Sequence, residues 1–451
     1  MYETFSENLI RLANACPYPL YVVGGRVRDY LSGLDAKEVD TDICAPATAE
    51  DFISRAEKCG FIVSAAYKNT GTVKIAFGGE AYEFTCFRSD EYVRGEHVPT
   101  NIFFTDDINA DARRRDFRCN AIYYDLKNRL FVDPLNGVDD VKNKRLDTVA
   151  PAAKVFGEDG LRLMRLARIA AQTGFKPTEE CLRAARGHRE LIRDVSVERV
   201  AAELKLILHA DERYGLKLAH YEGLKILKDI GVLHILLPEL CDGDGMAQRE
   251  DMHKYDVLEH SLRCAAYADG SVRLAALLHD VGKPYCFKET GSFKSHEETG
   301  ARIVAEICER LKLPKKLTEE TVRLTALHMY DFRCDARENK VRRFIVENID
   351  IFQKILLIKQ ADYSACRDDT GVAPSVAKMK DIYDKMRDEG VPFTLKELNI
   401  KGDCLLGLGF LPAEVGSTLK KLLLDCCIGQ VANDLEKLSA YASKVYLNSL
   451  K

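Results

Sequence analysis

Several features that mark specialised classes of protein are missing from this sequence. No run approaches the ~18 apolar residues of a membrane-spanning helix, so no membrane association is predicted. The opening residues, MYETFSENLI, contain no basic stretch followed by an apolar one, so no signal peptide is expected. No Cys-x-x-Cys pair occurs among the 15 cysteines, an odd number, which favours free thiols in a reducing cytoplasm.

The chain also has no excess of basic residues. Its net charge of −4 excludes a uniformly basic nucleic-acid binder, so any contact with nucleic acid would depend on local positive patches. With 451 residues, of which 46% are hydrophobic and 30% charged, it has the composition of a folded protein of roughly three or four domains.

The hydrophobic period changes along the chain. Short runs rich in Val, Ile, Phe and Tyr predict strands at 20–23, 39–43, 73–77 and 81–87, and Gly78-Gly79 predicts a hairpin between the last two. From about residue 140 onward the apolar residues follow the 3.6-residue period of helices. We therefore predict an α+β fold, with a small mixed β-sheet in the N-terminal part and an all-α remainder.

The segment YVVGGRVRDYL predicts a strand, a Gly24-Gly25 turn and a helix. Two glycines let the backbone approach a phosphate closely, and the helix N-terminus presents free N–H groups. Arg28, one turn into the helix, can add a charge-assisted contact. Because Gly-Gly turns are common, a purely structural turn is the alternative interpretation.

Asp40 and Asp42 in EVDTDI lie two residues apart, so on a strand both carboxylates point to one face. Two such charges repel each other unless a cation neutralises them, and Mg²⁺ prefers carboxylate and phosphate oxygens. The pair therefore predicts a catalytic site for two Mg²⁺ ions that transfers a phosphoryl group. Solvated Asp-x-Asp pairs are also frequent, and Glu83 on a neighbouring strand is a candidate third carboxylate.

Four motifs follow one another in a specific order. They are Gly-Gly-x-Val-Arg-Asp, Asp-x-Asp, RRDFRCNA (114–121) and EDGLRLMR (158–165). The set resembles the bacterial class II tRNA nucleotidyltransferases and their poly(A) polymerase relatives, and the C-terminal LKELNIKGDCLLGLGF is similar to the tail of that family. The resemblance implies template-independent addition of C, C and A to tRNA 3′ ends.

The resemblance also assigns roles to single residues. It implies metal ligation and catalysis by Asp40 and Asp42. It implies nucleotide contacts from residues of the glycine turn, the RRDF motif and the following helix: Gly24, Gly25, Arg28, Arg115, Asp116, Asn120, Asp159, Arg162, Arg165 and Arg168.

Within this set, Asp159 and Arg162 correspond to the pair that reads the base edge of incoming CTP or ATP. They lie about one helical turn apart and can face the same ligand. Successive steps of three residues drift by ~60° each, so Arg168 lies about half a turn round from Asp159. Arg165 and Arg168 are accordingly expected nearer phosphates than the base.

Residues 255–362 contain a second constellation. The pair His279-Asp280 ends an apolar helical segment, and other His and Asp residues occur on separate helical segments. The motif HDVGK resembles the HD-domain phosphohydrolases. This implies four core metal ligands and two further histidines of a dinuclear site, namely His260, His279, Asp280 and Asp362, with His296 and His328. Mg²⁺ or a divalent transition metal could occupy it, because mixed ligation does not select sharply.

The resemblance implies five segments. They are a nucleotidyltransferase head (1–139), a neck that reads the base (140–205), an RNA-binding body (206–250), an HD domain (251–385) and a tail (386–451). The charged segment 87–101 is predicted to be the flexible loop that favours full CCA or A-only addition over CC-only addition.

The predicted enzyme is a cytoplasmic CCA-adding tRNA nucleotidyltransferase. Its partners are CTP, ATP and the tRNA acceptor end, and its HD domain is expected to act as a phosphatase or 2′,3′-cyclic phosphodiesterase. The alternatives are an A-adding enzyme, a poly(A) polymerase, an HD phosphohydrolase with a degenerate head, and a non-catalytic RNA-binding protein. The sequence leaves the oligomeric state open.

Overall fold

The computed structural model describes residues 5–34, 41–91 and 100–445, so Asp40 lies outside the described residues. The chain divides into two compact units. Unit 1 comprises residues 1–241 and 309–313, and unit 2 comprises residues 242–308 and 314–451. The division at 241/242 lies near the predicted junction of body and HD domain. The other predicted boundaries fall inside the units.

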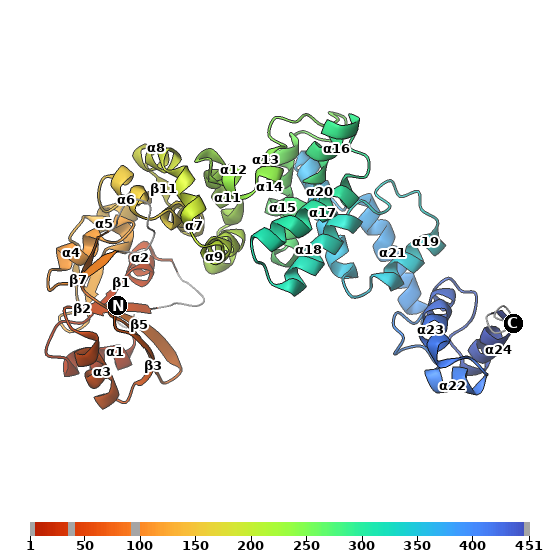
Figure 1. The fold of residues 1–451 in the computed structure, drawn as a ribbon, viewed down its shortest axis with the longest axis horizontal. Coiled ribbons are helices and arrows are strands. Elements are labelled where there is room, and N and C mark those ends of the chain that lie inside the picture. The colour runs from red at the N-terminus through yellow and green to blue at the C-terminus, as the bar shows by residue number, and fades with distance from the viewer. Residues whose placement is uncertain (1–4, 35–40, 92–99, 446–451) are drawn as a thin grey trace. The chain divides into compact units, whose positions relative to one another are not determined.

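The head of unit 1 is built on a mixed seven-stranded sheet with the order β3-β4-β5-β2-β1-β8-β9, in which β2 and β5 are parallel and the other neighbours antiparallel (Figure 1). The α+β fold with a mixed sheet is thereby confirmed. Its strands are β1 (Tyr21–Val23), β2 (Thr41–Ala45), β3 (Ile62–Tyr67), β4 (Thr72–Phe77), β5 (Glu80–Cys86), β8 (Tyr123–Asp125) and β9 (Leu130–Val132).

The predicted Gly78-Gly79 hairpin is present, since Phe77 pairs with Glu80 at the end of the β4–β5 ladder. The segment predicted as a loop over 87–101 differs from expectation. Its ends form an antiparallel ladder of β6 (Arg88–Glu91) and β7 (Asn101–Phe104), and residues 92–99 lie outside the described part. Backbone hydrogen bonds form this ladder. A charged sequence can make them as well as an apolar one, so the composition did not indicate the two strands.

Helices complete the head and build the rest of unit 1. Those of the head are α1 (Glu7–Ala15), α2 (Gly25–Ser32), α3 (Ala49–Lys58), α4 (Ile108–Arg113), the 3₁₀ helix η1 (Arg118–Asn120) and α5 (Gly137–Lys142). Those that follow are α6 (Ala152–Glu158), α7 (Leu161–Thr173), α8 (Glu179–Gly187), η2 (Arg189–Asp194), α9 (Val197–Leu208), α10 (Ala210–Tyr214), α11 (Ala219–Asp229), α12 (Val232–Leu236) and α13 (Pro238–Cys241). A two-residue parallel pair, β10 (Arg145–Leu146) and β11 (Lys176–Pro177), lies among them.

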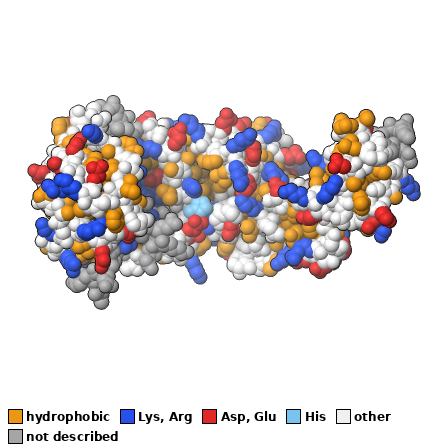
Figure 2. Space-filling model, turned by 90° about the horizontal axis from the view of Figure 1, so that it is seen from below, with side chains coloured by type: hydrophobic (Ala, Val, Ile, Leu, Met, Phe, Trp, Pro, Cys, Tyr) orange, Lys and Arg blue, Asp and Glu red, His pale blue; other side chains and the backbone are white. Residues whose placement is uncertain are grey.

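Among the described residues, helices with the length and apolarity to span a bilayer are absent. The distribution of charged side chains over the surface agrees with the small net charge of the chain. Figure 2 shows Lys and Arg side chains interspersed with Asp and Glu over the visible face, without one continuous basic surface there. Any nucleic-acid contact on this face would therefore use local groups of basic residues.

The described residues of unit 2 form helices joined by loops, without strands. Its helices are α14 (Val257–Tyr267), η3 (Gly270–Val272), α15 (Arg273–Leu278), α16 (Gly282–Thr290), α17 (His296–Arg310), α18 (Lys315–Leu327), α19 (Glu338–Glu347), α20 (Phe352–Arg367), α21 (Pro374–Asp388), α22 (Gly402–Gly407), α23 (Pro412–Cys427) and α24 (Leu435–Val445).

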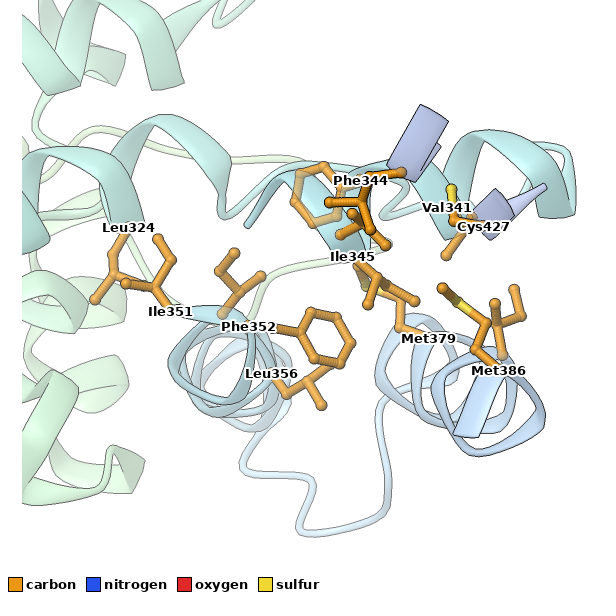
Figure 3. Packing of buried hydrophobic residues seen from close by; sticks show 14 of the residues in the cluster. Leu324, Val341, Phe344, Ile345, Ile351, Phe352, Leu356, Met379, Met386 and Cys427 are labelled. Atoms are coloured by element: carbon orange, nitrogen blue, oxygen red, sulfur yellow. The ribbon is translucent and has the colours of Figure 1, made fainter. Parts of the chain in front are cut away.

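One hydrophobic cluster runs through unit 2, from Cys264 on α14 to Ala442 on α24. In Figure 3, Phe344 on α19, Phe352 on α20 and Met379 on α21 converge between their helices. The cluster therefore continues across the predicted boundary between HD domain and tail at 385/386. The metal ligands expected on α14 and α20 are carried by helices that this core fixes.

Gly160 stands where two backbones meet, because a Cβ at this position would lie 2.4 Å from the carbonyl oxygen of Leu191. Its φ of −60° suits any residue, so the cost of Gly160→Ala comes from the clash alone. We expect this variant to lose about 1–3 kcal/mol of stability, as overpacking does, seen as a lower thermal midpoint by circular dichroism. Gly187→Ala on α8 is the control, since its Cβ meets no atom within 4 Å. Equal midpoints for the two variants would contradict this account.

Candidate active site and metal centre

The Gly24-Gly25 turn lies against the carboxylate of Asp42. Val23, just before the turn, pairs with Asp42 across the β1–β2 ladder. Gly24 has a φ of +80°, and a Cβ on it would lie 3.2 Å from Asp42 Oδ2. Glycine is therefore favoured twice here, by backbone conformation and by the close approach of the carboxylate. Asp42 is exposed at this edge, beside the N-terminus of α2.

Glu83 and Asp42 are register partners on the parallel strands β5 and β2. Register partners on neighbouring strands point to the same face of a sheet, so the two carboxylates share a face. Lys74 on β4 is the next register partner and lies 3.4 Å from Glu83. Glu83 thus remains a candidate third carboxylate, held by a lysine. The expected position of Asp40 beside Asp42 stays a prediction.

A buried hydrogen-bond network joins three of the predicted motifs. Arg28 donates to Oδ1 of Asn120 at 2.8 Å, and Nδ2 of Asn120 donates to Asp116 at 3.2 Å. Asp116 in turn accepts from Nε of Arg165 at 2.7 Å. Burial raises the pKa of Asp116, but Arg165 more than offsets this, and the pKa falls to about 2. The glycine turn, the RRDF motif and α7 are therefore one rigid, charge-balanced assembly.

The network ends on a residue that no motif indicated. The hydroxyl of Tyr214, at the end of α10, donates to Asp29 at 2.5 Å, and Arg28 donates to the same hydroxyl at 3.2 Å. Burial lowers the pKa of Arg28, but the carboxylate of Asp29 more than compensates and raises it above its usual range. Arg28 is thus held as a charged group behind the glycine turn.

Arg115 lies apart from this network. Its Nη2 donates to the buried carboxylate of Asp111 at 3.0 Å, and its Nε to the hydroxyl of Tyr123 at 3.2 Å. Burial raises the pKa of Asp111, but Arg115 and Arg114 outweigh it and bring the pKa to about 2. The contact with substrate expected of Arg115 stays a prediction.

The structure places Asp159 and Arg162 in different contacts. Asp159 lies just before α7, where its side chain accepts the N–H of Leu161 at 2.9 Å, and it lies 3.6 Å from Arg199. Arg162 is buried and donates to Glu158 at 2.7 Å and to the carbonyl oxygen of Arg114 at 3.0 Å. The expected spacing of one helical turn is therefore wrong, because Asp159 has an extended backbone ahead of α7 while Arg162 lies in its first turn. The role of the pair in reading a base stays a prediction.

Arg165 and Arg168 both point to carboxylates. Arg165 binds Asp116, and Nε of Arg168 donates to Glu203 on α9 at 2.6 Å. Burial lowers the pKa of Arg168, and the neighbouring Arg165 lowers it further. The expected phosphate contacts of both residues stay predictions.

The six residues predicted for the HD site do come together in unit 2. His260 Nε2 lies 3.0 Å from Asp362 Oδ1 and 3.2 Å from His279 Nε2. Asp280 stands between this group and a second one, with Oδ2 3.2 Å from His279 and Oδ1 3.1 Å from His296. His328 completes the second group, 3.3 Å from His296 between their Nε2 atoms. The carboxylate of Asp280 is thus shared by two half-sites. The first contains His260, His279 and Asp362, and the second contains His296 and His328.

The orientation of the imidazole rings suits the binding of metal cations. Nδ1 of His279, His296 and His328 lies 2.7–2.8 Å from the carbonyl oxygen of the residue three positions earlier, so Nδ1 carries the proton. With Nδ1 as the donor, the Nε2 atoms of these rings face one another and Asp280. Both oxygens of Asp280 are buried, and their close contacts lack hydrogen-bond geometry. Imidazole nitrogens and carboxylate oxygens gathered in this way fit divalent metal ions.

The pKa values show how the protein balances charge at this centre: burial lowers the pKa of His279, but Asp280 outweighs this and raises it well above its usual range. Burial raises the pKa of Asp280, but His279 and Lys283 outweigh it, and the pKa lies well below its usual range. Burial lowers the pKa of His328 to about 3, so this ring is neutral. Lys283 lies 2.6 Å from Asp280 and also donates to Gln248 at 2.8 Å.

Gly282 of the HDVGK motif explains how His296 of the second half-site is brought close to Asp280. A Cβ on Gly282 would lie 2.1 Å from the carbonyl oxygen of His296 and 2.6 Å from the nitrogen of Gly300. Only glycine lets α16 and α17 approach this closely. The approach brings His296, the first residue of α17, to Asp280.

A cavity of about 670 Å³ opens onto the HD centre and exposes Asp280, His296 and Asp362 to it. Its wall combines basic and apolar side chains, among them Lys294, Arg333, Met252, Phe293 and Phe332. Such a lining suits an anionic ligand that also has an apolar part.

Three segments of the chain match models of known families. Residues 20–147 match the "Poly A polymerase head domain", residues 174–243 the "Probable RNA and SrmB- binding site of polymerase A", and residues 257–355 the "HD domain". These three segments are thus similar to the head and RNA-binding parts of poly(A) polymerases and to HD domains.

Two relatives illustrate the similarity in sequence. An A-adding tRNA nucleotidyltransferase of Deinococcus radiodurans is 29% identical over 93% of this chain and 94% of its own length. A CCA-adding enzyme of Lactobacillus helveticus is 36% identical over 41% of this chain and 45% of its own length. The match to the second relative therefore spans less than half of that protein.

Solved structures show the same fold. The CCA-adding enzyme of Bacillus stearothermophilus, solved in complex with CTP, has a TM-score of 0.69 at 22% identity and covers 100% of this chain and 99% of its own. The CCA-adding enzyme of Thermotoga maritima, solved with tRNA, has a TM-score of 0.58 at 17% identity and covers 100% and 97%.

The ligand geometry predicts the metal content of the HD centre. After loading with Ni²⁺, which imidazoles bind well, and desalting, we expect Asp280→Asn to hold two ions fewer per chain than the wild type by mass spectrometry. His328→Gln should hold one fewer, because it empties only the second half-site. His234→Gln, at an exposed position of unit 1, is the control. Unchanged metal content in Asp280→Asn would contradict the shared-carboxylate arrangement.

Proposed function

We propose that this chain adds C, C and A to tRNA 3′ ends from CTP and ATP without a nucleic-acid template. The observation that carries the proposal is the exposed carboxylate of Asp42 beside the Gly24-Gly25 turn, within a domain of the poly(A) polymerase head family. The relatives named CCA-adding or A-adding enzymes support the choice of substrate.

The residues of the head have distinct tasks in this proposal. Asp40 and Asp42 hold Mg²⁺, which when bound activates the 3′-hydroxyl and stabilises the departing pyrophosphate. The turn at Gly24 and Gly25 leaves room for the triphosphate next to Asp42, at the start of α2. Arg28 keeps a positive charge behind this turn, since its network with Asp29 and Asn120 fixes it there.

Base choice is assigned to Asp159 and Arg162. An aspartate accepts from the exocyclic amine that C and A share, and an arginine donates to the adjacent ring acceptor, which U and G do not offer in this arrangement. Glu158 fixes the Arg162 guanidinium at 2.7 Å, so the start of α7 is rigid before a nucleotide arrives. A protein surface of fixed donors and acceptors would then act in place of a template.

We propose that the tRNA acceptor end contacts the region 174–243. Exposed arginines are frequent there and in the adjoining turns, at Arg183, Arg186, Arg189, Arg193 and Arg199. Phosphate contacts and helix shape are enough for recognition of an RNA stem. We place the enzyme in the cytoplasm, where tRNA processing and reduced thiols go together.

A second function follows from the HD centre. Two ions held by the shared carboxylate of Asp280 would supply a metal-bound hydroxide for hydrolysis of a phosphate ester. Lys283, Lys294 and Arg333 line the adjoining cavity and can bind a phosphate group. We therefore propose phosphatase or 2′,3′-cyclic phosphodiesterase activity for unit 2, with Mg²⁺ or a divalent transition metal.

Nucleotide addition is tested with three tRNAs, ending before CCA, in C and in CC, each with labelled CTP, ATP or both in Mg²⁺. The proposal expects CCA completion on all three by wild type and a loss of at least about 100-fold in Asp42→Asn, because a ligand of the reacting ions is lost. Asp280→Asn, in unit 2, is the matched control and should retain addition. Addition of A alone to the CC-ending tRNA would identify an A-adding enzyme, and no addition at all would refute the proposal.

Hydrolysis is tested separately with p-nitrophenyl phosphate and a 2′,3′-cyclic nucleotide in Mg²⁺, Mn²⁺ or Ni²⁺. We expect Asp280→Asn to abolish turnover because both half-sites lose their common ligand, while Asp42→Asn turns over like wild type. Residual hydrolysis that is equal in wild type and Asp280→Asn would show that the HD centre is not its source.

A further inference from the structure

A second group of ligating side chains adjoins the HD centre, on the side of His260. The ligating atoms of His253, His260 and Cys366 all lie within 4.8 Å of one another. His253 precedes α14, and Cys366 lies on α20 one helical turn after Asp362. The rings of His253 and His260 are perpendicular, with centroids 4.9 Å apart. Neither His253 nor Cys366 belongs to the six residues that the HD motif indicated.

The nitrogen atoms of this group are not satisfied by the protein. His260 is fully buried and its Nε2 faces the HD centre, but its Nδ1 has no hydrogen-bond partner among the described residues. The buried Nδ1 of His253 also has no hydrogen-bond partner among the described residues. His279 and His328 differ, because each places Nδ1 against a backbone carbonyl oxygen. A buried polar atom without a partner is costly, so two such nitrogens beside a thiol indicate a missing ligand.

We propose that His253, His260 and Cys366 form a third metal subsite that binds a thiophilic divalent cation of the zinc class, with His260 as a bridging imidazolate: its ring releases its N–H proton to solvent, so that Nδ1 binds this cation while Nε2 faces the HD centre. Two imidazoles and a thiolate are the donor set that Zn²⁺ prefers, whereas Mg²⁺ selects oxygen ligands. The subsite therefore differs in chemistry from both the carboxylate site of the head and the imidazole–carboxylate centre beside it.

The surroundings leave a coordination position open. His253 and Cys366 both line the cavity that adjoins the HD centre, so a cation held by them faces that cavity. Accessible zinc sites have three protein ligands and a fourth coordination position that faces a cavity. Water or an anionic oxygen can complete it. The subsite does not depend on nucleotide addition or on hydrolysis by unit 2.

The test uses Co²⁺ as the probe in the full-length protein. A cysteine thiolate bound to Co²⁺ gives an intense charge-transfer absorption in the near ultraviolet, which imidazole and carboxylate ligands do not give. We expect this band in the wild type and its loss on addition of Zn²⁺. Cys366→Ser should abolish it, and His253→Gln should weaken Co²⁺ binding by about tenfold or more. Cys404→Ser, at a partly exposed cysteine of α22, is the matched control and should keep the band.

The outcomes separate this subsite from the HD centre. His328→Gln should keep the thiolate band, because it removes a ligand of the other half-site only. If Cys366→Ser folds poorly by circular dichroism, His253→Gln provides the decisive measurement. A wild type without the band overturns the proposal. So does a band that survives in Cys366→Ser and disappears in Cys264→Ser, because Cys264 lies next to His279.

Discussion

A buried carboxylate is stable only where positive charge meets it, and both candidate sites are arranged around that constraint. In unit 1 the chain supplies the charge itself, because Arg115 and Arg165 bind Asp111 and Asp116. In unit 2 the carboxylate of Asp280 meets Lys283 and a ring of imidazoles whose Nε2 atoms face inward. The first arrangement is complete without a ligand, and the second calls for cations.

In the head, the paired carboxylates of the buried network serve a structural role, and the carboxylate proposed for catalysis lies outside that network. The network from Tyr214 through Arg28 and Asn120 to Asp116 holds the glycine turn and α7 in one arrangement. Asp42 stands outside it, exposed beside Gly24. A fixed frame with an exposed carboxylate at its edge suits the proposed reaction, in which nucleotides enter and pyrophosphate leaves.

Much of this arrangement could be predicted from the sequence where a local pattern fixes geometry. The Gly78-Gly79 hairpin is present, because turn chemistry leaves few alternatives, and the six residues predicted for the HD site lie close together, although their role as ligands stays a prediction. The partners of the arginines could not be predicted. Helical phase tells which face Arg162 occupies, but not that its guanidinium reaches the backbone of Arg114. Tyr214, His253 and Cys366 belong to no motif, and only tertiary packing brings them to their sites.

The donor sets also imply that the two units need not compete for one metal. The head offers carboxylate oxygens on a strand, which suit Mg²⁺ at the high concentrations at which cells keep it. The HD centre offers four imidazoles and two carboxylates, and imidazole binds transition metals far better than it binds Mg²⁺. A change in the supply of transition metal would then alter occupancy in unit 2 while the head keeps its Mg²⁺. Under the proposed assignment of metals, the chain would therefore respond to metal supply in one unit without losing the chemistry of the other.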